Sequence, residues 1–346
     1  MEWIKEPIKP ISLEFRRKAL ERQGQLTKPP GSLGELEALA VRLSSMQQRV
    51  DPAIKKVQIT VFAADHGVVE EGVSAFPQSV TQMMLANFVA GGAAISVLAK
   101  QQSALLEVVD VGVKGGSISL SSVIQASVGE GTANFVQNAA MSSSQCNLAL
   151  AAGRDAVDRA VAAEATLFVG GEMGIGNTTS ASALACALLN GSPEALVGSG
   201  TGVDQAGQLR KQQVIERALE RHRGRLSSPL SILQHLGGFE IAALVGAYLR
   251  CGQKGLPVIV DGFIATVAAL LAVRMAPELK TWLFYGHQSR EPGHRFLLSE
   301  LGEKPLLDLN MRLGEGSGAA VAIALLQTAC LLHNQMATFE EAGISA

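Results

Sequence analysis

The sequence predicts an α/β fold in which a parallel sheet is covered by helices. Short apolar runs of strand length alternate with helical stretches rich in small residues along most of the 346-residue chain. These runs are unbroken rather than alternating with polar residues, which is typical of parallel strands that are buried on both faces. Each run is followed by a polar or glycine-rich turn, as in a series of strand–helix units.

The elements can be assigned in chain order. Apolar residues at helical spacing predict helices over residues 12–23 and 33–50. Two prolines and two glycines enforce extended or turning backbone between them, in the segment LTKPPGSLG of residues 26–34. Later helices are expected over residues 180–189 and 318–333. The expected strands lie at residues 57–62, 105–109, 165–169, 257–260 and 281–285.

Composition excludes several classes of function. Lys and Arg number 29 against 31 for Asp and Glu, so the net charge of -2 gives no electrostatic case for nucleic acid or an anionic membrane as a partner.

The four cysteines form no Cys-x-x-Cys pair, and most lie in apolar runs, as expected of buried thiols in a reducing compartment. The N-terminus is acidic and contains Pro7, unlike a secretory signal. The apolar stretch at 262–273 is too short to span a bilayer, and the one at 316–332 is expected to be a buried helix. We therefore expect a soluble, cytoplasmic protein.

Chemically capable residues follow each predicted strand. They are Asp65 and His66, Asp110, the segment 171–179, Asp261, and His287 with Ser289. In open α/β sheets, ligands bind outside the carboxyl ends of the strands. We therefore expect these turns to converge on one site.

Two glycine-rich turns are candidates for binding an anion. Glu172–Thr179 joins a strand to a helix, and its glycines with Asn177 and Thr178 could form a phosphate cradle; a plain turn capped by Thr is the alternative. Residues 198–204 form the second turn, and Lys211 follows it as a possible anion contact or as an ordinary surface lysine. The chain contains no Gly-x-Gly-x-x-Gly and no Gly-Lys, which argues against the common dinucleotide and triphosphate loops.

Glu315 is the candidate general base. It lies between Gly314 and Gly316 and precedes a long helix, so a partly desolvated carboxylate there would have a raised pKa suited to proton abstraction. A solvated loop glutamate at a helix N-terminus is the alternative. His66, His287 and His294 lie in separate segments without ligand spacing, and we expect no metal site.

Several segments together resemble the nicotinate-nucleotide–dimethylbenzimidazole phosphoribosyltransferases of cobalamin lower-ligand assembly. The matching blocks follow family order from about residue 26 to residue 343: LTKPPGSLG (26–34), ADHGVV (64–69), GVSAFP (72–77), GEMGIGNTT (171–179), VDGF (260–263), GHQSREPGH (286–294) and RLGEGSGA (312–319).

The resemblance implies transfer of 5-phosphoribose from nicotinate mononucleotide to 5,6-dimethylbenzimidazole, giving α-ribazole 5′-phosphate and nicotinate. It implies no cofactor, because the pyridinium is already an activated leaving group. A binding module without turnover, or a phosphorolytic glycosyltransferase, is the alternative. Glu315, a possible general base between two glycines, favours an enzyme over a binding module.

The resemblance also implies roles for individual residues. Glu315 would be the catalytic base. The benzimidazole pocket would be lined by Ser74, Phe76, Gln82, Met311 and Leu313. The nucleotide and its phosphate would be bound by Glu172, Gly174, Gly176, Thr178, Gly200, Gly202, Lys211 and Ser289.

The family comparison further implies how the chain is organised. The large domain, about residues 51–317, would be a Rossmann-like parallel sheet covered by helices. Residues 1–50 and about 318–346 would form a smaller helical domain. The resemblance also implies a homodimer and small-molecule substrates, without nucleic acid or membrane as partner.

Overall fold

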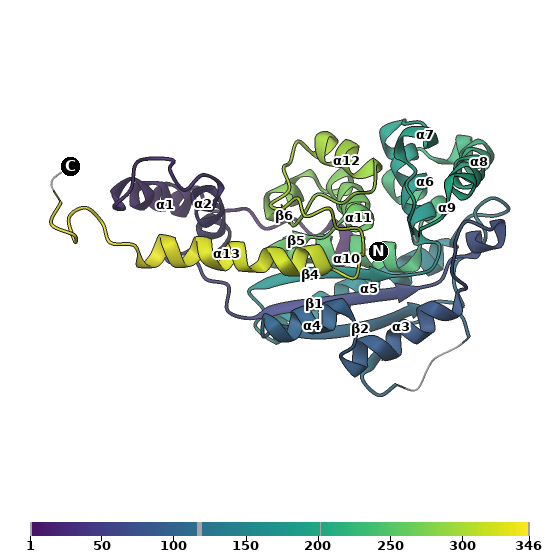
Figure 1. Cartoon of the computed structure of the whole chain (residues 1–346), viewed down its shortest axis with the longest axis horizontal. Coiled ribbons are helices and arrows are strands. Elements are labelled where there is room, and N and C mark those ends of the chain that lie inside the picture. The colour runs from purple at the N-terminus through teal and green to yellow at the C-terminus, as the bar shows by residue number, and fades with distance from the viewer. Residues whose placement is uncertain (1, 116–119, 201, 345–346) are drawn as a thin grey trace.

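A six-stranded parallel sheet forms the centre of the molecule (Figure 1). The computed structural model describes residues 2–115, 120–200 and 202–344. Its strands are β1 (Val57–Ala64), β2 (Leu105–Gly112), β3 (Val123–Gln125), β4 (Leu167–Met173), β5 (Val258–Val260) and β6 (Leu283–Tyr285). The spatial order β3-β2-β1-β4-β5-β6 is the Rossmann order, which confirms the fold class predicted from the sequence. The chain reverses its winding direction between β1 and β4.

Helices cover both faces of this sheet. The α-helices are α1 (Leu13–Gln25), α2 (Glu35–Gln47), α3 (Ser79–Ala90), α4 (Ala94–Gln101), α5 (Ser143–Ala162), α6 (Asn177–Leu189), α7 (Pro193–Leu196), α8 (Gln205–His222), α9 (Pro229–Leu236), α10 (Phe239–Lys254), α11 (Phe263–Met275), α12 (Gly293–Leu301) and α13 (Ser317–Gln335). One face carries α3, α4 and α13, whereas α10 packs on the opposite face with α5 against it (Figure 1). Every residue of β1 is consequently buried, as its unbroken apolar run predicts.

The short strand β3 was not predicted from the sequence. It has only three residues and pairs with Val108–Asp110 of β2 at the edge of the sheet. Only Val123 and Ile124 in it are apolar, with serines before them and Gln125 after them, so no apolar run marks the strand. The five predicted strands are all present, with β1, β2 and β4 extending further at their carboxyl ends than expected.

Helices from the two terminal regions of the chain, α1, α2 and α13, pack together in one helical group (Figure 1). Arg22 of α1 donates to the carbonyl oxygens of His333 (2.7 Å) and Asn334 (3.0 Å), which lie in the last turn of α13. Cations are favourable at this end of a helix because its last carbonyls lack intrahelical partners. These contacts support a small helical domain built from both termini. Its sequence boundaries, 1–50 and about 318–346, stay a proposal.

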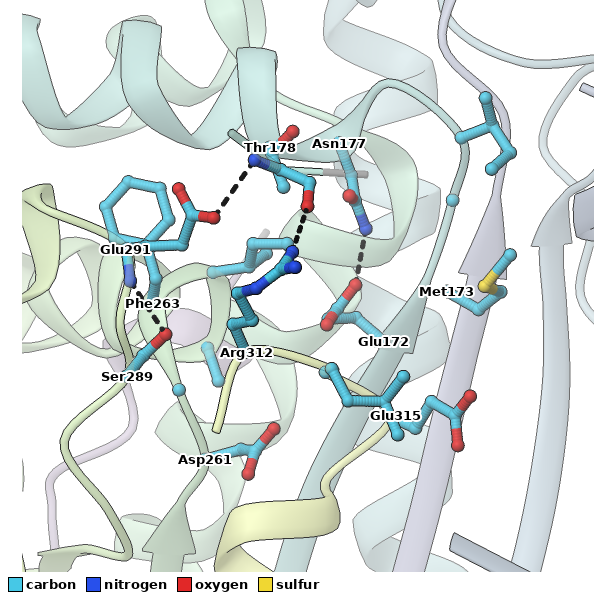
Figure 2. A pocket seen from close by; sticks show the side chains of 18 of the residues that line it. Glu172, Met173, Asn177, Thr178, Asp261, Phe263, Ser289, Glu291, Arg312 and Glu315 are labelled. Carbon is cyan, nitrogen blue, oxygen red and sulfur yellow. Dashed lines mark hydrogen bonds between the residues drawn. The ribbon is translucent and has the colours of Figure 1, made fainter. Parts of the chain in front are cut away.

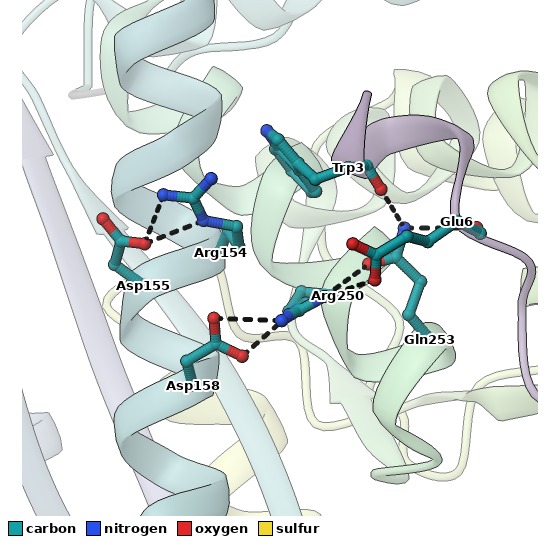
Figure 3. Close-up of polar contacts among 7 residues, drawn as sticks. All are labelled: Trp3, Glu6, Arg154, Asp155, Asp158, Arg250 and Gln253. Carbon is teal, nitrogen blue, oxygen red and sulfur yellow. Dashed lines mark hydrogen bonds and ion pairs between the residues drawn. The ribbon is translucent and has the colours of Figure 1, made fainter. Parts of the chain in front are cut away.

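Residues 3–9 pack on the sheet-containing part of the molecule (Figure 3). Arg250 of α10 contacts Asp158 of α5 and also Glu6, each at 2.7 Å. The side chain of Gln253 donates to the Trp3 carbonyl oxygen at 2.9 Å. The N-terminal segment therefore crosses α10 before the chain enters α1.

Two helical segments, Ser79–Gln101 and Ser317–Gln335, are long and apolar enough to cross a membrane by length and composition alone. Buried core helices of soluble proteins pass the same test. In the second segment 56% of the apolar window is buried inside the structure, and the helix packs against β4, β5 and α4. This agrees with the buried helix expected there. In the first segment only 33% is buried, so α3 and α4 present apolar residues on their outer side.

Candidate active site

A cavity of about 340 Å³ opens at the carboxyl ends of β4, β5 and β6. Its wall is built from the loop after each of these strands, the loop before α13, and part of α3. Figure 2 shows that its two ends differ. Thr178, Ser289 and Glu291 lie at one end, and Met173 and Glu315 lie at the other. The cavity therefore has a polar end and an end with an apolar wall.

Glu315 is held in an unusual backbone conformation. Gly314, Glu315 and Gly316 have φ angles of 89°, 64° and 83°, so three consecutive residues occupy the left-handed region. Glycine adopts this region without steric cost, whereas Glu315 carries a Cβ. On the other side of this loop lies Gly171 of β4, where an added Cβ would come within 2.3 Å of the Glu315 carbonyl oxygen. The sequence thus needs glycine at three positions in order to place one carboxylate.

The Glu315 side chain is only 6% exposed, and Oε2 accepts a hydrogen bond from Ile95 N at 3.4 Å. Ile95 lies in the first turn of α4, whose N-cap residue Ala93 offers no capping side chain. Burial raises the pKa of Glu315; the bond from Ile95 lowers it, and the nearby Asp261 carboxylate raises it further. A raised pKa is what a general base working near neutral pH requires.

Glu172 lies at the carboxyl end of β4 and faces the cavity from a buried position. Its Oε2 accepts a hydrogen bond from the side-chain amide of Asn177 (Figure 2). Burial holds the pKa of Glu172 well above its usual value, with repulsion from Glu240 and Asp261 acting in the same direction. The sequence analysis treated Asn177 and Thr178 as possible helix caps. Both instead lie in the first turn of α6, whose N-cap is Gly176 without a capping side chain.

At the polar end, Gly200 connects three charged side chains. Glu291 Oε1 accepts from Gly200 N at 3.0 Å, and Arg312 Nη1 donates to Gly200 O at 3.3 Å. Lys211 lies immediately behind, since a Cβ on Gly200 would come within 2.5 Å of its Nζ. Burial lowers the pKa of Lys211, and Glu291 opposes this shift. This end of the cavity therefore combines glycine backbone, hydroxyl groups and cations, which suits an anion.

The structure brings together most of the site residues predicted from the sequence. Those that line the cavity are Phe76, Glu172, Gly174, Thr178, Gly200, Ser289, Leu313 and Glu315. Those that do not line it are Ser74, Gln82, Gly176, Gly202, Lys211 and Met311.

The predicted site residues that do not line the cavity lie in nearby turns and helices. The Ser74 hydroxyl accepts from Phe76 N and donates to Phe76 O, shaping the turn that presents the half-exposed Phe76 ring. Gln82 is partly buried on α3, and the Met311 carbonyl oxygen accepts a hydrogen bond from Arg290 N. Gly176 has a φ of 99°, and a Cβ there would come within 2.7 Å of Val69. Gly202 also has a positive φ, of 98°.

The expectation that all five strand ends converge is wrong for β1 and β2. Asp65 accepts from the Thr81 hydroxyl at 2.8 Å and from Lys114 N at 2.9 Å, so its carboxylate joins α3 to the loop after β2 instead of facing the cavity. His66 pairs with the buried Glu240 at 2.7 Å. Asp110 accepts from the backbone N–H groups of Gly112 and Val113 at the end of β2. Since other parts of the fold use these side chains, the cavity forms mainly at the ends of β4, β5 and β6, and the segment after β1 contributes Phe76, Val80 and Met84 instead.

Of the two histidines after β6, His287 lines the cavity and His294 lies behind its wall. His294 Nδ1 accepts from Ser289 N at 2.8 Å, and its Nε2 lies 3.0 Å from the Thr266 hydroxyl. His287 Nε2 lies 3.6 Å from Asp261 Oδ1. Over the described ranges, no group of three or more His, Cys, Asp or Glu side chains could hold a metal ion.

Several residues that line the cavity were not among the predicted site residues, including Asn177, Asp261, Glu291 and Arg312. The sequence analysis had noted Asp261 as a strand-end residue and Asn177 as part of a possible phosphate cradle. Glu291 and Arg312 lie within the motif blocks at 286–294 and 312–319, and that position was the available signal.

Comparison with known proteins agrees with this arrangement. A family described as "Phosphoribosyltransferase" matches residues 8–344. The nicotinate-nucleotide–dimethylbenzimidazole phosphoribosyltransferase of Pseudomonas fluorescens (strain SBW25) is 58% identical over 99% of this chain and 98% of its own length. The protein of the same name from Pseudomonas aeruginosa (strain LESB58) is 54% identical over 100% and 98%.

A crystal structure of such an enzyme from Thermus thermophilus superposes with a TM-score of 0.92 at 48% identity, covering 97% of this chain and 100% of that one. The similarity therefore spans the entire sheet, the helices on both faces and the cavity-forming loops. The chain belongs to the nicotinate-nucleotide–dimethylbenzimidazole phosphoribosyltransferase family.

Proposed function

We propose that this enzyme transfers the 5-phosphoribosyl group of nicotinate mononucleotide to 5,6-dimethylbenzimidazole in cobalamin lower-ligand assembly. One observation carries the proposal: a buried carboxylate, Glu315, stands at the apolar end of a cavity whose other end is suited to an anion. A benzimidazole is flat and apolar with a ring N–H, and the nucleotide carries a phosphate. The two ends of the cavity match the two substrates.

The chemistry needs a base more than it needs an acid. A benzimidazole nitrogen forms a bond to the anomeric carbon while the bond from that carbon to the pyridinium nitrogen breaks. The electron pair of the broken bond stays on nicotinate, whose ring leaves neutral. The benzimidazole becomes cationic and loses its N–H proton to Glu315. Attack opposite the leaving group inverts the anomeric configuration, which gives the α product.

The polar end of the cavity would hold the nucleotide. Thr178, Gly200 and Ser289 line it, and the Lys211 ammonium lies behind Thr178 and Gly200. We assign Gly174 to the backbone that approaches the nucleotide, and Gly176 and Gly202 to the turns that shape the two loops. Glu172, held by Asn177, is positioned to orient the ribose or the base.

The apolar wall would hold the benzimidazole. Phe76, Val80, Met84, Met173 and Leu313 contribute to the cavity lining. Phe76 is 52% exposed and Leu313 58% exposed, so the wall is open to an incoming aromatic ring. Ser74 would act by fixing the Phe76 turn, and we place Gln82 and Met311 behind this wall.

Product analysis by mass spectrometry tests the proposed reaction. The protein is incubated with nicotinate mononucleotide and dimethylbenzimidazole, with and without inorganic phosphate. We expect α-ribazole 5′-phosphate and nicotinate under both conditions. Nicotinate release that requires phosphate and leaves the benzimidazole unchanged would identify a phosphorolytic enzyme instead. Binding of the nucleotide without any product would identify a non-catalytic module.

We also propose that the enzyme is a cytoplasmic homodimer that acts without a membrane. Support comes from the outer side of α3 and α4, where Met83 is 67% exposed, Val97 57% and Val89 38%. Such an apolar surface favours contact with a second protein surface. Analytical ultracentrifugation should show a dimer that Val97→Asp weakens and that the control Leu209→Asp on α8, a site 54% exposed, leaves intact. A monomeric wild-type protein would refute this proposal.

A further inference from the structure

Asp261 lies immediately after β5 and beneath the loop that carries Glu315. The residue is 2% exposed, and both carboxylate oxygens have backbone donors. Oδ1 accepts from Ala319 N at 2.8 Å, and Oδ2 accepts from Gly316 N at 3.2 Å. Gly316 is the N-cap residue of α13 and has no side chain that could cap the helix. A carboxylate from a different strand therefore performs this capping.

The bond from Gly316 N holds the residue next to Glu315, and the bond from Ala319 N holds the first turn of α13. A left-handed conformation at a residue that carries a Cβ costs on the order of 1–3 kcal/mol and persists only where the surroundings enforce it. Two contacts enforce it here. Asp261 holds Gly316 from the C-terminal side of the loop, and the Ser317 hydroxyl donates to Gly314 O at 2.7 Å. The Glu315 backbone is thus fixed from both sides.

Asp261 also acts on Glu315 through its charge. Repulsion between the two carboxylates raises the pKa of Glu315, in the same direction as burial. Glu172 is a further carboxyl that interacts electrostatically with Glu315. His287, after β6, lies beside Asp261, with its Nε2 3.6 Å from Oδ1. Because its oxygens already have backbone donors, Asp261 is less suited to binding substrate than to holding this loop.

We infer that Asp261 is a positioning residue for the reaction: by capping α13 across the sheet, it holds the Gly314–Gly316 loop so that the Glu315 carboxylate faces the acceptor base. The inference rests on the proposed function of Glu315. It assigns to Asp261 no contact with the reacting atoms. The position of the Glu315 carboxylate then depends on Asp261, more than fifty residues away in the sequence.

Asp261→Asn separates this role from a general structural one. Asparagine keeps the size and one acceptor oxygen, but its amide turns a donor toward one of the two backbone N–H groups. We expect kcat with dimethylbenzimidazole to fall about 10²-fold, the scale of a misplacement of about 1 Å. The KM for nicotinate mononucleotide should stay unchanged, because its phosphate binds at the opposite end of the cavity.

Two readouts identify the mechanism of that loss. With 1,5,6-trimethylbenzimidazole, which has no ring N–H to lose, the variant should lose much less activity than with dimethylbenzimidazole. The acidic limb of the kcat profile should also move to lower pH, because one of the charges that raise the Glu315 pKa is gone. Equal losses with both acceptors, an unmoved limb, or wild-type kcat would each overturn the inference.

Ser317→Ala provides the second variant and covers the case in which Asp261→Asn does not fold. It removes the hydroxyl bond to Gly314 O, keeps the backbone bond from Ser317 N at 3.0 Å, and leaves both carboxylates in place. We expect a smaller loss of kcat, again mainly with the proton-bearing acceptor, and no movement of the acidic limb. An unchanged kcat would overturn the inference that side-chain hydrogen bonds to this loop position Glu315. Failure of the wild-type enzyme to form product would instead refute the proposed function, which makes the two failures distinguishable.

Discussion

The Lys211 ammonium lies 3.2 Å from the Thr178 hydroxyl, with the lysine only 2% exposed. The sequence analysis expected this cation in the nucleotide site, and the structure places it directly behind the cavity wall. Thr178 lines the cavity, so the charge of Lys211 reaches a bound anion across one side chain. A buried cation is screened by water much less than an exposed one, which makes this indirect contact effective.

Lys211→Ala should therefore weaken binding of nicotinate mononucleotide. A charge-assisted interaction contributes about 1.5–3 kcal/mol, so KM for the nucleotide should rise while the KM for dimethylbenzimidazole stays nearly constant. Arg221→Ala removes a positive charge from the exposed end of the same helix and serves as the control. Steady-state kinetics with each substrate varied in turn measures both constants. Equal effects on the two substrates would count against the assignment.

Gly171→Ala should damage catalysis by displacing the Glu315 loop. The added Cβ would meet the Glu315 carbonyl oxygen at 2.3 Å, and rigid backbone cannot move aside cheaply. Gly170→Ala is a matched control on the same strand, because its Cβ would meet the end of the flexible Leu244 side chain at 2.5 Å. Overpacking of this kind costs about 1–3 kcal/mol. We expect thermal unfolding to detect destabilisation in both variants and kcat to fall strongly only in Gly171→Ala. A comparable fall in both would remove the specific link to Glu315.

His294 makes the stability of the fold depend on pH. Burial lowers the pKa of this ring from 6.5 to about 3, with repulsion from His287 as a smaller cause. Between these values the unfolded chain binds a proton that the folded protein does not bind. The free energy of unfolding therefore falls as the pH is lowered from 6.5 toward 3 and rises again as the pH is raised. Its slope is at most about 1.4 kcal/mol per pH unit.

His294→Gln isolates this contribution, because other titrating groups cancel in the comparison with wild type. Denaturant titrations at several pH values give the difference in unfolding free energy between the two proteins. We expect the unfolding free energy of wild type, relative to that of His294→Gln, to increase as the pH rises to about 6.5 and to remain constant above it. A difference independent of pH would mean that the folded-state ring titrates normally.

The sequence predicts the sheet well because its signal is local. Each long strand is rich in apolar and β-branched residues, so β1, β2 and β4 were located from their own residues. The motif around Glu315 was equally visible, because a carboxylate between glycines is unusual. What could not be predicted is which strand ends face the ligand. Asp65 and Asp261 look alike in the sequence, yet Asp65 joins α3 to the loop after β2 and Asp261 lies beneath the Gly314–Gly316 loop.

The burial of individual side chains is the second property that could not be predicted from the sequence. Lys211 was equally compatible with the surface and with the site, and only the packing of α8 on α6 buries it. Glu291 contacts Gly200 across ninety-one residues of chain, a separation that no local pattern reports. Contacts of this kind follow from the strand order, which places the loops after β4 and β6 on the two sides of β5.

The most direct test of the account is the pH profile of kcat for Glu315→Gln. Glutamine keeps the volume and one acceptor oxygen but cannot take a proton. We expect the variant to fold, to bind nicotinate mononucleotide, and to lose about 10²–10⁴-fold in kcat with dimethylbenzimidazole at neutral pH. The loss should be smaller with an acceptor that has no ring proton. In the wild-type enzyme the acidic limb reports protonation of Glu315 above the usual range of a glutamate, and that limb should disappear from the variant. A variant with near wild-type kcat and an unchanged acidic limb would contradict the role of Glu315 and make Glu172 the next candidate for the base.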